Sequence, residues 1–327
     1  MKRILVLGMV ALSVGAADAQ SPRTFIPERF YNTFSGAHAP ALRIKPGERI
    51  VTKTIDAAGV DWNGRQVGQG PNPQTGPFFV EGAEPGDMLV VKFDKIEINR
   101  ATAYSGGALA PYTVTPGALL ARTERQAARA NWILDKATGT ARLDNNDIGG
   151  LELKLRPMLG CVGVAPARKE AIATSTPGAF GGNMDYAGVN QGVTVMLPVN
   201  EPGALLFIGD GHALQGEGEV VGTGLETSMD VEFTVQVVKK SPIQWPRLDN
   251  DTHVMVLGSE RSLIEALQHA TAEMHRWLMQ DYGLSERGAS LLMGQTLEYE
   301  VANVVDPRFT MVAKMRKSIL AGLKRSQ

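Results

Sequence analysis

Glycine and proline turns break the sequence into short segments, and this spacing constrains the fold more than any other feature. The chain has 36 glycines and 18 prolines, which suits short strands joined by tight turns better than a bundle of helices. Segments rich in β-forming residues run from residue 42 to 56 and from 88 to 99, with Gly-Pro-Asn-Pro and Glu-Pro-Gly-Asp turns between them. The sequence therefore predicts a mainly β protein.

The clearest strand pattern lies at residues 231–237, where apolar residues at odd-numbered positions alternate with polar ones. A period of two places the apolar side chains on one face, which predicts a half-buried strand. Residues 192–199 and 203–208 are expected to form a pair of strands joined by a turn at 200–202. Long helices do not alternate with strands, which disfavours a doubly wound fold.

The pattern changes after residue 259. Apolar residues recur at helical spacing from Ile264 to Leu278, after a serine that can cap a helix. A second helix is expected from Ser285, with Gly283 as the stop between the two. We expect this C-terminal helical hairpin to pack on the sheets, and α+β is the alternative fold class. Residues 101–147 carry turn signals around one possible strand.

Residues 1–19 resemble a secretory signal. Lys2 and Arg3 precede an apolar run from residue 4 to 16, and Ala-Asp-Ala ends at Ala19. An uncleaved anchor is the alternative, but the apolar run is short for a bilayer span. We expect cleavage after Ala19, one domain over residues 20–327, a periplasmic location and no membrane contact after cleavage.

The charge balance and the single cysteine limit the possible partners and chemistry. Thirty-three basic residues against 34 acidic ones leave a formal charge of −1, which argues against nucleic acid and against an anionic membrane surface. A small molecule is the expected partner. Cys161 lies among apolar residues, and we interpret it as a buried small residue because no sequence feature marks a base that would generate its thiolate.

The glycine-rich segment 209–219 holds the most suggestive histidine. Its exposed backbone can bring Asp210, His212, Glu217 and Glu219 together. One imidazole with several carboxylates can bind zinc or a harder divalent ion. The alternative is a turn whose acidic residues face water.

Two further loops carry candidate polar residues. Asn183 could donate to a developing oxyanion and Asp185 could bind a cation, although both are also ordinary turn residues. Glu81 follows an apolar pair among turn residues. It could act as a general acid and base or as a metal ligand, or it could be a solvated carboxylate at the end of a strand.

Taken together, these segments resemble the acetamidase/formamidase family. The shared pattern joins Thr-Gly-Pro…Val-Glu-Gly-Ala-Glu-Pro-Gly-Asp at 75–87 to Gly-Gly-Asn-x-Asp at 181–185. It continues through Leu-Pro-Val at 197–199 into Gly-Asp-Gly-His-Ala-x-Gln-Gly-x-Gly-Glu at 209–219. The resemblance covers roughly residues 25–315.

The resemblance implies a β-sandwich-like fold, a divalent metal ion and hydrolysis of formamide, acetamide or a similar short amide to acid and ammonia. We expect zinc or calcium as the metal, and a homodimer. The expected metal ligands are Asp185, Asp210, His212 and Glu219.

The expected catalytic residues are Glu81, Asn183 and His212. Glu81 would transfer the proton, and Asn183 would be an additional hydrogen-bond donor to the tetrahedral intermediate. The sequence departs from the family at Phe30-Tyr31-Asn32, where many members carry a histidine. Two alternatives therefore stay open: a hydrolase of a larger or cyclic amide, and a periplasmic protein that binds amides without hydrolysing them.

Overall fold

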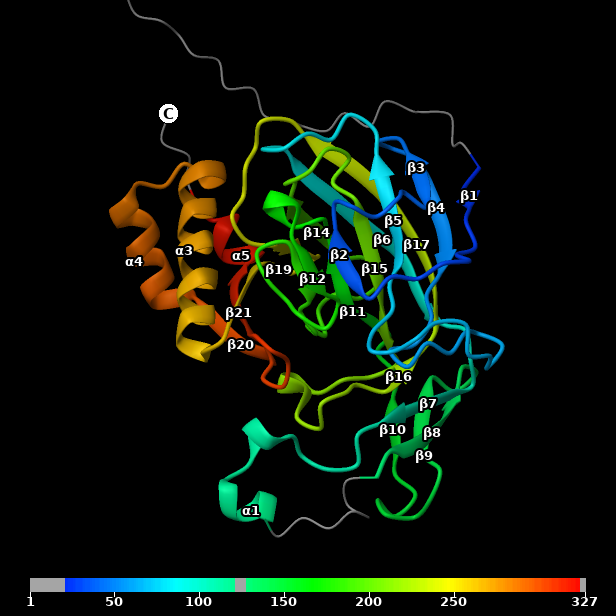
Figure 1. Ribbon diagram of the computed structural model, residues 1–327. Coiled ribbons are helices and arrows are strands. Elements are labelled where there is room, and N and C mark those ends of the chain that lie inside the picture. Colours follow the sequence, from blue (N-terminus) through cyan, green and yellow to red (C-terminus); the bar gives the residue numbers. More distant parts are fainter. Residues whose placement is uncertain (1–20, 121–127, 324–327) are drawn as a thin grey trace, which may run out of the picture.

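Two large β-sheets pack face to face in the computed structural model, which describes residues 21–120 and 128–323 (Figure 1). Phe78 on one sheet and Phe233 on the other meet with ring centres 5.2 Å apart. The main apolar core lies between the sheets and takes buried residues from both. The expected mainly β, sandwich-like fold is therefore confirmed. The predicted signal, residues 1–19, lies outside the described residues.

The first sheet, within the described residues, runs in the order β1-β4-β17-β6-β14-β18-β19-β21-β20. Its strands are β1 (Arg23–Thr24), β4 (Arg49–Lys53), β6 (Met88–Ile98), β14 (Thr194–Pro198), β17 (Met229–Val238), β18 (Arg247–Asp249), β19 (His253–Glu260), β20 (Glu298–Asn303) and β21 (Phe309–Arg316). Burial alternates along most of β17, which confirms the predicted half-buried strand.

The second sheet runs in the order β10-β9-β8-β7-β16-β15-β11-β13, while β5 pairs with β15 and β3 pairs with β5. Its strands are β3 (Leu42–Ile44), β5 (Thr75–Val80), β7 (Thr102–Ser105), β8 (Ala130–Asp135), β9 (Thr140–Leu143), β10 (Glu152–Lys154), β11 (Met158–Gly163), β13 (Gly181–Asn183), β15 (Leu206–His212) and β16 (Glu226–Thr227). A separate small sheet joins β2 (Thr33–Ser35) to β12 (Ala171–Ala173).

The predicted pairing of residues 192–199 with 203–208 is wrong. The first segment becomes β14, which pairs with β6 and β18, whereas the second becomes β15 of the other sheet. Ala204 and Leu205 both adopt left-handed backbone conformations between the two strands. This bend carries the chain from one sheet to the other, and a hairpin cannot form.

The C-terminal hairpin of α3 (Leu263–Tyr282) and α4 (Glu286–Thr296) is confirmed. Ser262 and Ser285 cap the two helices, and Gly283 ends α3 in the left-handed conformation. Helix α3 packs on β19 and β21 (Figure 1). Ile264 was expected on the packed face of α3, but its side chain is 65% exposed.

The other described helices are short. They are α1 (Pro116–Leu120), α5 (Lys317–Leu320) and the 3-10 turns η1 (Pro111–Thr113), η2 (Ala167–Lys169) and η3 (Glu217–Glu219). Among the described helices, none has both the length and the apolar character needed to cross a membrane.

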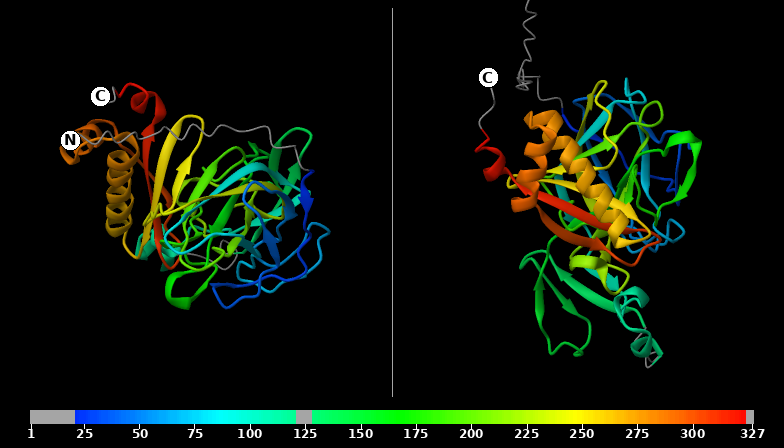
Figure 2. Two further views of the ribbon diagram at one scale, coloured as in Figure 1. Left: turned by 90° about the horizontal axis from the view of Figure 1, so that it is seen from above. Right: turned by 90° about the vertical axis from the view of Figure 1, so that its left-hand side faces the viewer.

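Strands β7 to β10 extend the second sheet away from the body of the molecule (Figure 2). The sequence indicated one strand in residues 101–147, but the described part of this region contains β7, β8 and β9. These strands pair in succession, with Tyr104 of β7 opposite Asn131 of β8. The extension begins beside β16 and so reaches the edge of the candidate site described below.

Candidate active site

Strand β15 places two of the expected ligands on one side of the second sheet. Asp210 and His212 are two residues apart on this buried strand, so their side chains point to the same face. Strand β11 runs alongside, with Gly160 between the pairs that join Leu159 to Gly211 and Cys161 to Gly209. A Cβ atom at Gly160 would lie 2.3 Å from Asp185 Oδ1 and 2.5 Å from Asp210 Oδ2. The absence of a side chain at Gly160 lets the two carboxylates meet.

The other expected ligands reach the same point from separate elements. Asp185 follows β13, and its backbone N–H donates to Gly160 O over 3.0 Å. Glu219 ends η3, while Glu226 of β16 lies directly opposite His212 of β15. The fold therefore brings Asp185, Asp210, His212 and Glu219 together, and it adds Glu226.

Three of these residues have an unusual backbone conformation. Asp185, Asp210 and Glu219 adopt φ angles of 45°, 58° and 52°. Positive φ is uncommon for residues other than glycine, and such residues cluster at functional sites. The local backbone is therefore shaped to direct these carboxylates.

The imidazole of His212 is held from both sides. Its Nδ1 lies 2.7 Å from Gln215 Oε1, while Gln215 Nε2 donates to Asp185 O over 2.6 Å. Because the amide oxygen of Gln215 faces Nδ1, that nitrogen carries the proton in the neutral imidazole. The Nε2 atom then presents its lone pair to the carboxylates, 2.9 Å from Glu226 Oε1 and 3.5 Å from Asp210 Oδ1.

The carboxylates in this cluster outnumber the cations. Burial raises the pKa of Asp185 and Glu219 well above the usual carboxyl range, and it raises that of Glu226 to about 7. Burial by itself would lower the pKa of His212, but the charges of Glu226 and Asp210 outweigh it and raise that pKa well above its usual value. Buried carboxylates without compensation are costly, so the cluster favours protons or a cation.

The potential ligand atoms of the cluster are suited to a divalent cation. Asp185 Oδ1, His212 Nε2 and Glu226 Oε2 are buried and accept no hydrogen bond within the described residues. Asp185, His212 and Glu219 form one potential ligand set, and Asp210, His212 and Glu226 form another; within each set the ligand atoms lie within 4.8 Å of one another. Since Nδ1 of His212 is engaged by Gln215, both sets share the single Nε2 atom.

Asn183 lies beside the cluster, but its amide is already engaged. Its Nδ2 atom donates to Asp185 Oδ2 and to Asp306 Oδ2, each over 2.7 Å. Asn303 Nδ2 donates to the same two oxygens, also over 2.7 Å. Asn183 is therefore placed to hold two carboxylates, and its expected role as an oxyanion donor stays a prediction.

Glu81 is not brought to the cluster. Strand β5 runs antiparallel to β15, with Thr75 opposite Ile208 and Phe78 opposite Leu206. Thr75 thus lies near the end of β15 that carries Asp210, whereas Glu81 follows the opposite end of β5. Six residues of extended strand span ~20 Å. The geometry therefore places Glu81 away from the cluster and gives no support to the prediction that it transfers the proton.

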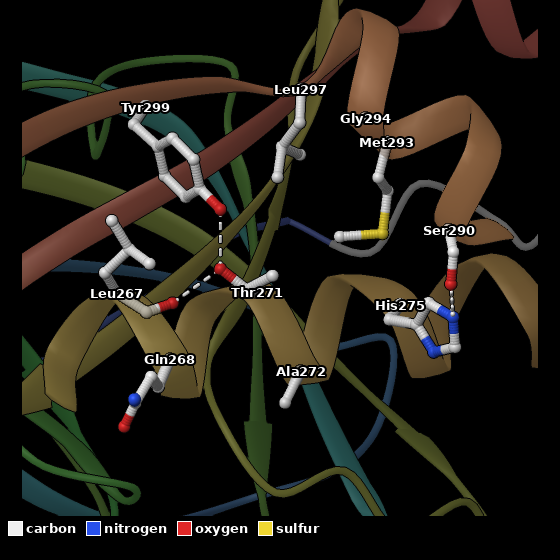
Figure 3. A pocket seen from close by; sticks show the side chains of 10 residues that line it. All are labelled: Leu267, Gln268, Thr271, Ala272, His275, Ser290, Met293, Gly294, Leu297 and Tyr299. Atoms are coloured by element: carbon white, nitrogen blue, oxygen red, sulfur yellow. Dashed lines mark hydrogen bonds between the residues drawn. The ribbon is translucent and has the colours of Figure 1, made fainter. Parts of the chain in front are cut away.

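A cavity of about 450 Å³ opens beside the cluster. Asp210, Glu219, Glu226 and Asp306 line it together with Asn72, Tyr104 and Arg129. A second cavity, of about 720 Å³, lies between α3 and α4 (Figure 3). No carboxylate lines this second cavity, and its Tyr299 and Thr271 hydroxyl groups bond each other over 2.7 Å. Of these two cavities, only the first is lined by carboxylates, whereas the second has a single histidine, His275.

Comparisons with a family model and with solved structures identify the relatives of this chain. The model of the Acetamidase/Formamidase family matches residues 27–170 and 167–307. The chain therefore belongs to the Acetamidase/Formamidase family. An acetamidase structure from Yersinia enterocolitica is 29% identical, with a TM-score of 0.79, over 92% of this chain and 94% of that one.

Two further relatives match different shares of this chain. A structure from Thermoanaerobacter tengcongensis, titled as a predicted acetamidase/formamidase, is 30% identical over 92% of this chain and 97% of that one, with a TM-score of 0.77. A Schizosaccharomyces pombe protein provisionally named a formamidase is 24% identical over 59% of this chain. That match spans 63% of the yeast protein, less than two thirds of its length.

Sequence reasoning missed Glu226, Asp306 and Gln215 as members of the site. Gln215 stands inside the glycine-rich motif, and Asp306 lies in the Val-Val-Asp-Pro segment near the C-terminus. The position of Gln215 inside that motif was the available signal for it. Glu226 had none, because only the pairing of β16 with β15 brings it opposite His212.

Proposed function

We propose that this chain hydrolyses a small carboxamide to the carboxylic acid and ammonia, using a divalent metal ion held by Asp185, Asp210, His212 and Glu219. One observation carries the proposal. The potential metal-ligand atoms around His212 Nε2 are buried and include atoms without hydrogen-bond partners. A ligand set of one imidazole and several carboxylates suits zinc and also tolerates calcium. A divalent ion bound there polarises the amide carbonyl and lowers the pKa of water.

Asp306 is the proposed proton-transfer residue. It lines the cavity but belongs to neither potential ligand set. Two amide donors, Asn183 and Asn303, hold its Oδ2 atom, while burial raises its pKa to about 6. A carboxylate fixed in this way can accept a proton from the attacking water at one oxygen and return it to the nitrogen of the leaving ammonia.

The other groups position the reacting ones. Gln215 orients His212 through Nδ1, and Asn183 and Asn303 hold Asp185 and Asp306 at a fixed separation. Gly224 packs against the ring, since a Cβ atom there would lie 2.5 Å from His212 Nδ1. Outer contacts of this kind commonly change metal affinity or activity by about 10- to 100-fold.

Purified protein tests the proposal through metal content and ammonia release. Protein prepared without chelator should contain a divalent metal and release ammonia from formamide or acetamide. Chelation should abolish turnover, and adding zinc or calcium separately should identify the ion that restores it. Amide binding without ammonia release, in metal-loaded protein, would favour the alternative of a binding protein.

We also propose that the chain is exported and assembles as a homodimer. The charged start, the apolar run and Ala-Asp-Ala before Gln20 support export. Intact-mass measurement of the exported protein should place the mature N-terminus at Gln20. Light scattering of the same sample should give twice the mass of one chain, and a monomer mass would contradict the assembly.

A further inference from the structure

The cavity beside the carboxylate cluster is larger than a short amide needs. Acetamide has four non-hydrogen atoms, and if each takes the roughly 30 Å³ that one water molecule occupies in the liquid, it would fill ~120 Å³. The cavity measures about 450 Å³. Two neighbouring cavities, of about 440 and 990 Å³, share lining residues with it. The site therefore has room for a substrate that extends beyond the amide.

Arg129 lies at the junction of these spaces, because it lines all three cavities. Its guanidinium carbon lies 3.6 Å from the centre of the Tyr104 ring. Within the part of the chain that the structure describes, no carboxylate lies within ion-pair distance of Arg129. The nearby Asp56 is paired with Arg100 over 2.7 Å. Arg129 is thus a cation whose charge the described acidic residues leave without a direct partner.

The strand ladder fixes how far Arg129 lies from the cluster. Glu226 of β16 is opposite Tyr104 of β7, and Tyr104 is opposite Asn131 of β8, two residues after Arg129. Neighbouring strands lie ~4.8 Å apart. Since the guanidinium lies over the ring of Tyr104, it is roughly one to two strand spacings, about 5–10 Å, from the carboxylates of the cluster.

We propose that Arg129 is a specificity-determining residue that binds a carboxylate on the substrate, so that the preferred substrate is the monoamide of a short dicarboxylic acid. The amide of such a molecule would lie at the cluster, and its carboxylate would meet the guanidinium. The inference rests on the proposed amide hydrolysis and names the class of amide.

The chemistry of the two ends supports this orientation. An anionic substrate end is repelled by Asp210, Glu219 and Glu226, so it is directed away from the cluster toward Arg129. A guanidinium matches a carboxylate with two parallel hydrogen bonds, which a neutral amide group cannot reproduce. The aromatic face of Tyr104 restrains the guanidinium without neutralising it.

Paired substrates test the inference. Succinamate carries one carboxylate, and succinamide is its neutral isostere. The wild-type enzyme should hydrolyse succinamate with the higher kcat/KM. Arg129→Gln should lower the ratio of the two kcat/KM values by about 10- to 100-fold, the usual effect of losing a hydrogen bond to a charged group. The loss should appear mainly in KM, because the carboxylate is bound equally in the ground state and the transition state.

Two further variants separate charge at the cavity from charge elsewhere. Arg129→Lys keeps the charge but loses the paired geometry, so the ratio should fall part of the way. Arg142→Gln removes a charge from the neighbouring strand β9 outside the cavities and should leave the ratio at the wild-type value.

Active wild-type enzyme with no preference for succinamate, or an unchanged ratio in Arg129→Gln, overturns the inference alone. Failure of metal-loaded enzyme to release ammonia from acetamide, succinamide and succinamate overturns the proposed function together with it.

Discussion

Two groups of charged side chains in this protein centre on buried carboxylates but differ in the balance of negative and positive charge. At the helical hairpin, Glu273 of α3 is completely buried and its carboxylate meets Arg247 and Arg276. Arg247 Nε donates to Glu273 Oε1 over 2.8 Å, and its guanidinium also lies over the Trp277 ring. Here one carboxylate faces two guanidinium groups, and its oxygens are hydrogen-bonded.

The cluster around His212 has the opposite balance. Four buried carboxylates, on Asp185, Asp210, Glu219 and Glu226, surround a single imidazole. Two of their oxygens, Asp185 Oδ1 and Glu226 Oε2, accept no hydrogen bond within the described residues. Burial of charge alone therefore does not mark a functional site. An excess of one charge and unused donor atoms together indicate that a cation completes the site.

The largest effect should come from His212→Ala, because both potential ligand sets depend on the Nε2 atom of His212. Loss of a ligand should reduce activity by more than the roughly 10- to 100-fold that loss of an outer-shell partner costs. Metal content should fall together with activity. Circular dichroism should show a retained β fold, because His212 is not part of the apolar core between the sheets. Full metal content in this variant would remove His212 from the site.

Asp306→Asn should have the next largest effect and should separate proton transfer from metal binding. The substitution preserves size but removes the carboxylate, so we expect a loss of about 10²- to 10⁴-fold in kcat with metal retained. Glu81→Gln is the matched control, because Glu81 lies at the far end of β5. Its turnover should stay within about threefold of wild type. If Glu81→Gln is the slower variant, the assignment of the proton to Asp306 is wrong.

Part of this site could be predicted from the sequence. Asp185, Asp210, His212 and Glu219 stand in two glycine-rich motifs, so local sequence was enough to select them. Glu81 stands in a motif of similar appearance, but it follows the end of β5 that is farther from the cluster. The direction in which a strand runs past its neighbour is a long-range property, and a motif does not encode it.

The same limit applies to the fold. The period of two in β17 and the caps of α3 and α4 are local features, and each was predicted correctly. The pairing of β14 with β6 depends on residues about a hundred positions apart. A short connection suggested a hairpin, whereas the left-handed Ala204 and Leu205 direct the chain into the other sheet.

Gln215→Leu should give a smaller effect, in metal affinity more than in folding. Leucine keeps most of the volume but cannot accept from His212 Nδ1 or donate to Asp185 O. The imidazole would lose its fixed tautomer, and we expect metal affinity to fall by about 10- to 100-fold. Competition with a chromophoric chelator measures this change. Saturating metal should restore most of the activity, and failure to do so would indicate that Gln215 acts in the reaction itself.

The smallest effect on activity should come from the other cluster, through Arg247→Met. Removing this guanidinium leaves Glu273 buried with Arg276 as its remaining cationic partner, and breaking a buried pair in this way costs about 3–5 kcal/mol of unfolding free energy. Urea unfolding should show the loss, while metal content and kcat of the folded enzyme stay at wild-type values.

The double variant Arg247→Met with Glu273→Leu should recover much of the lost stability, because it removes the uncompensated carboxylate as well. A double variant as unstable as the single one would mean that packing, and not charge balance, sets the stability of this cluster. A fall in metal content would mean that the two clusters are coupled.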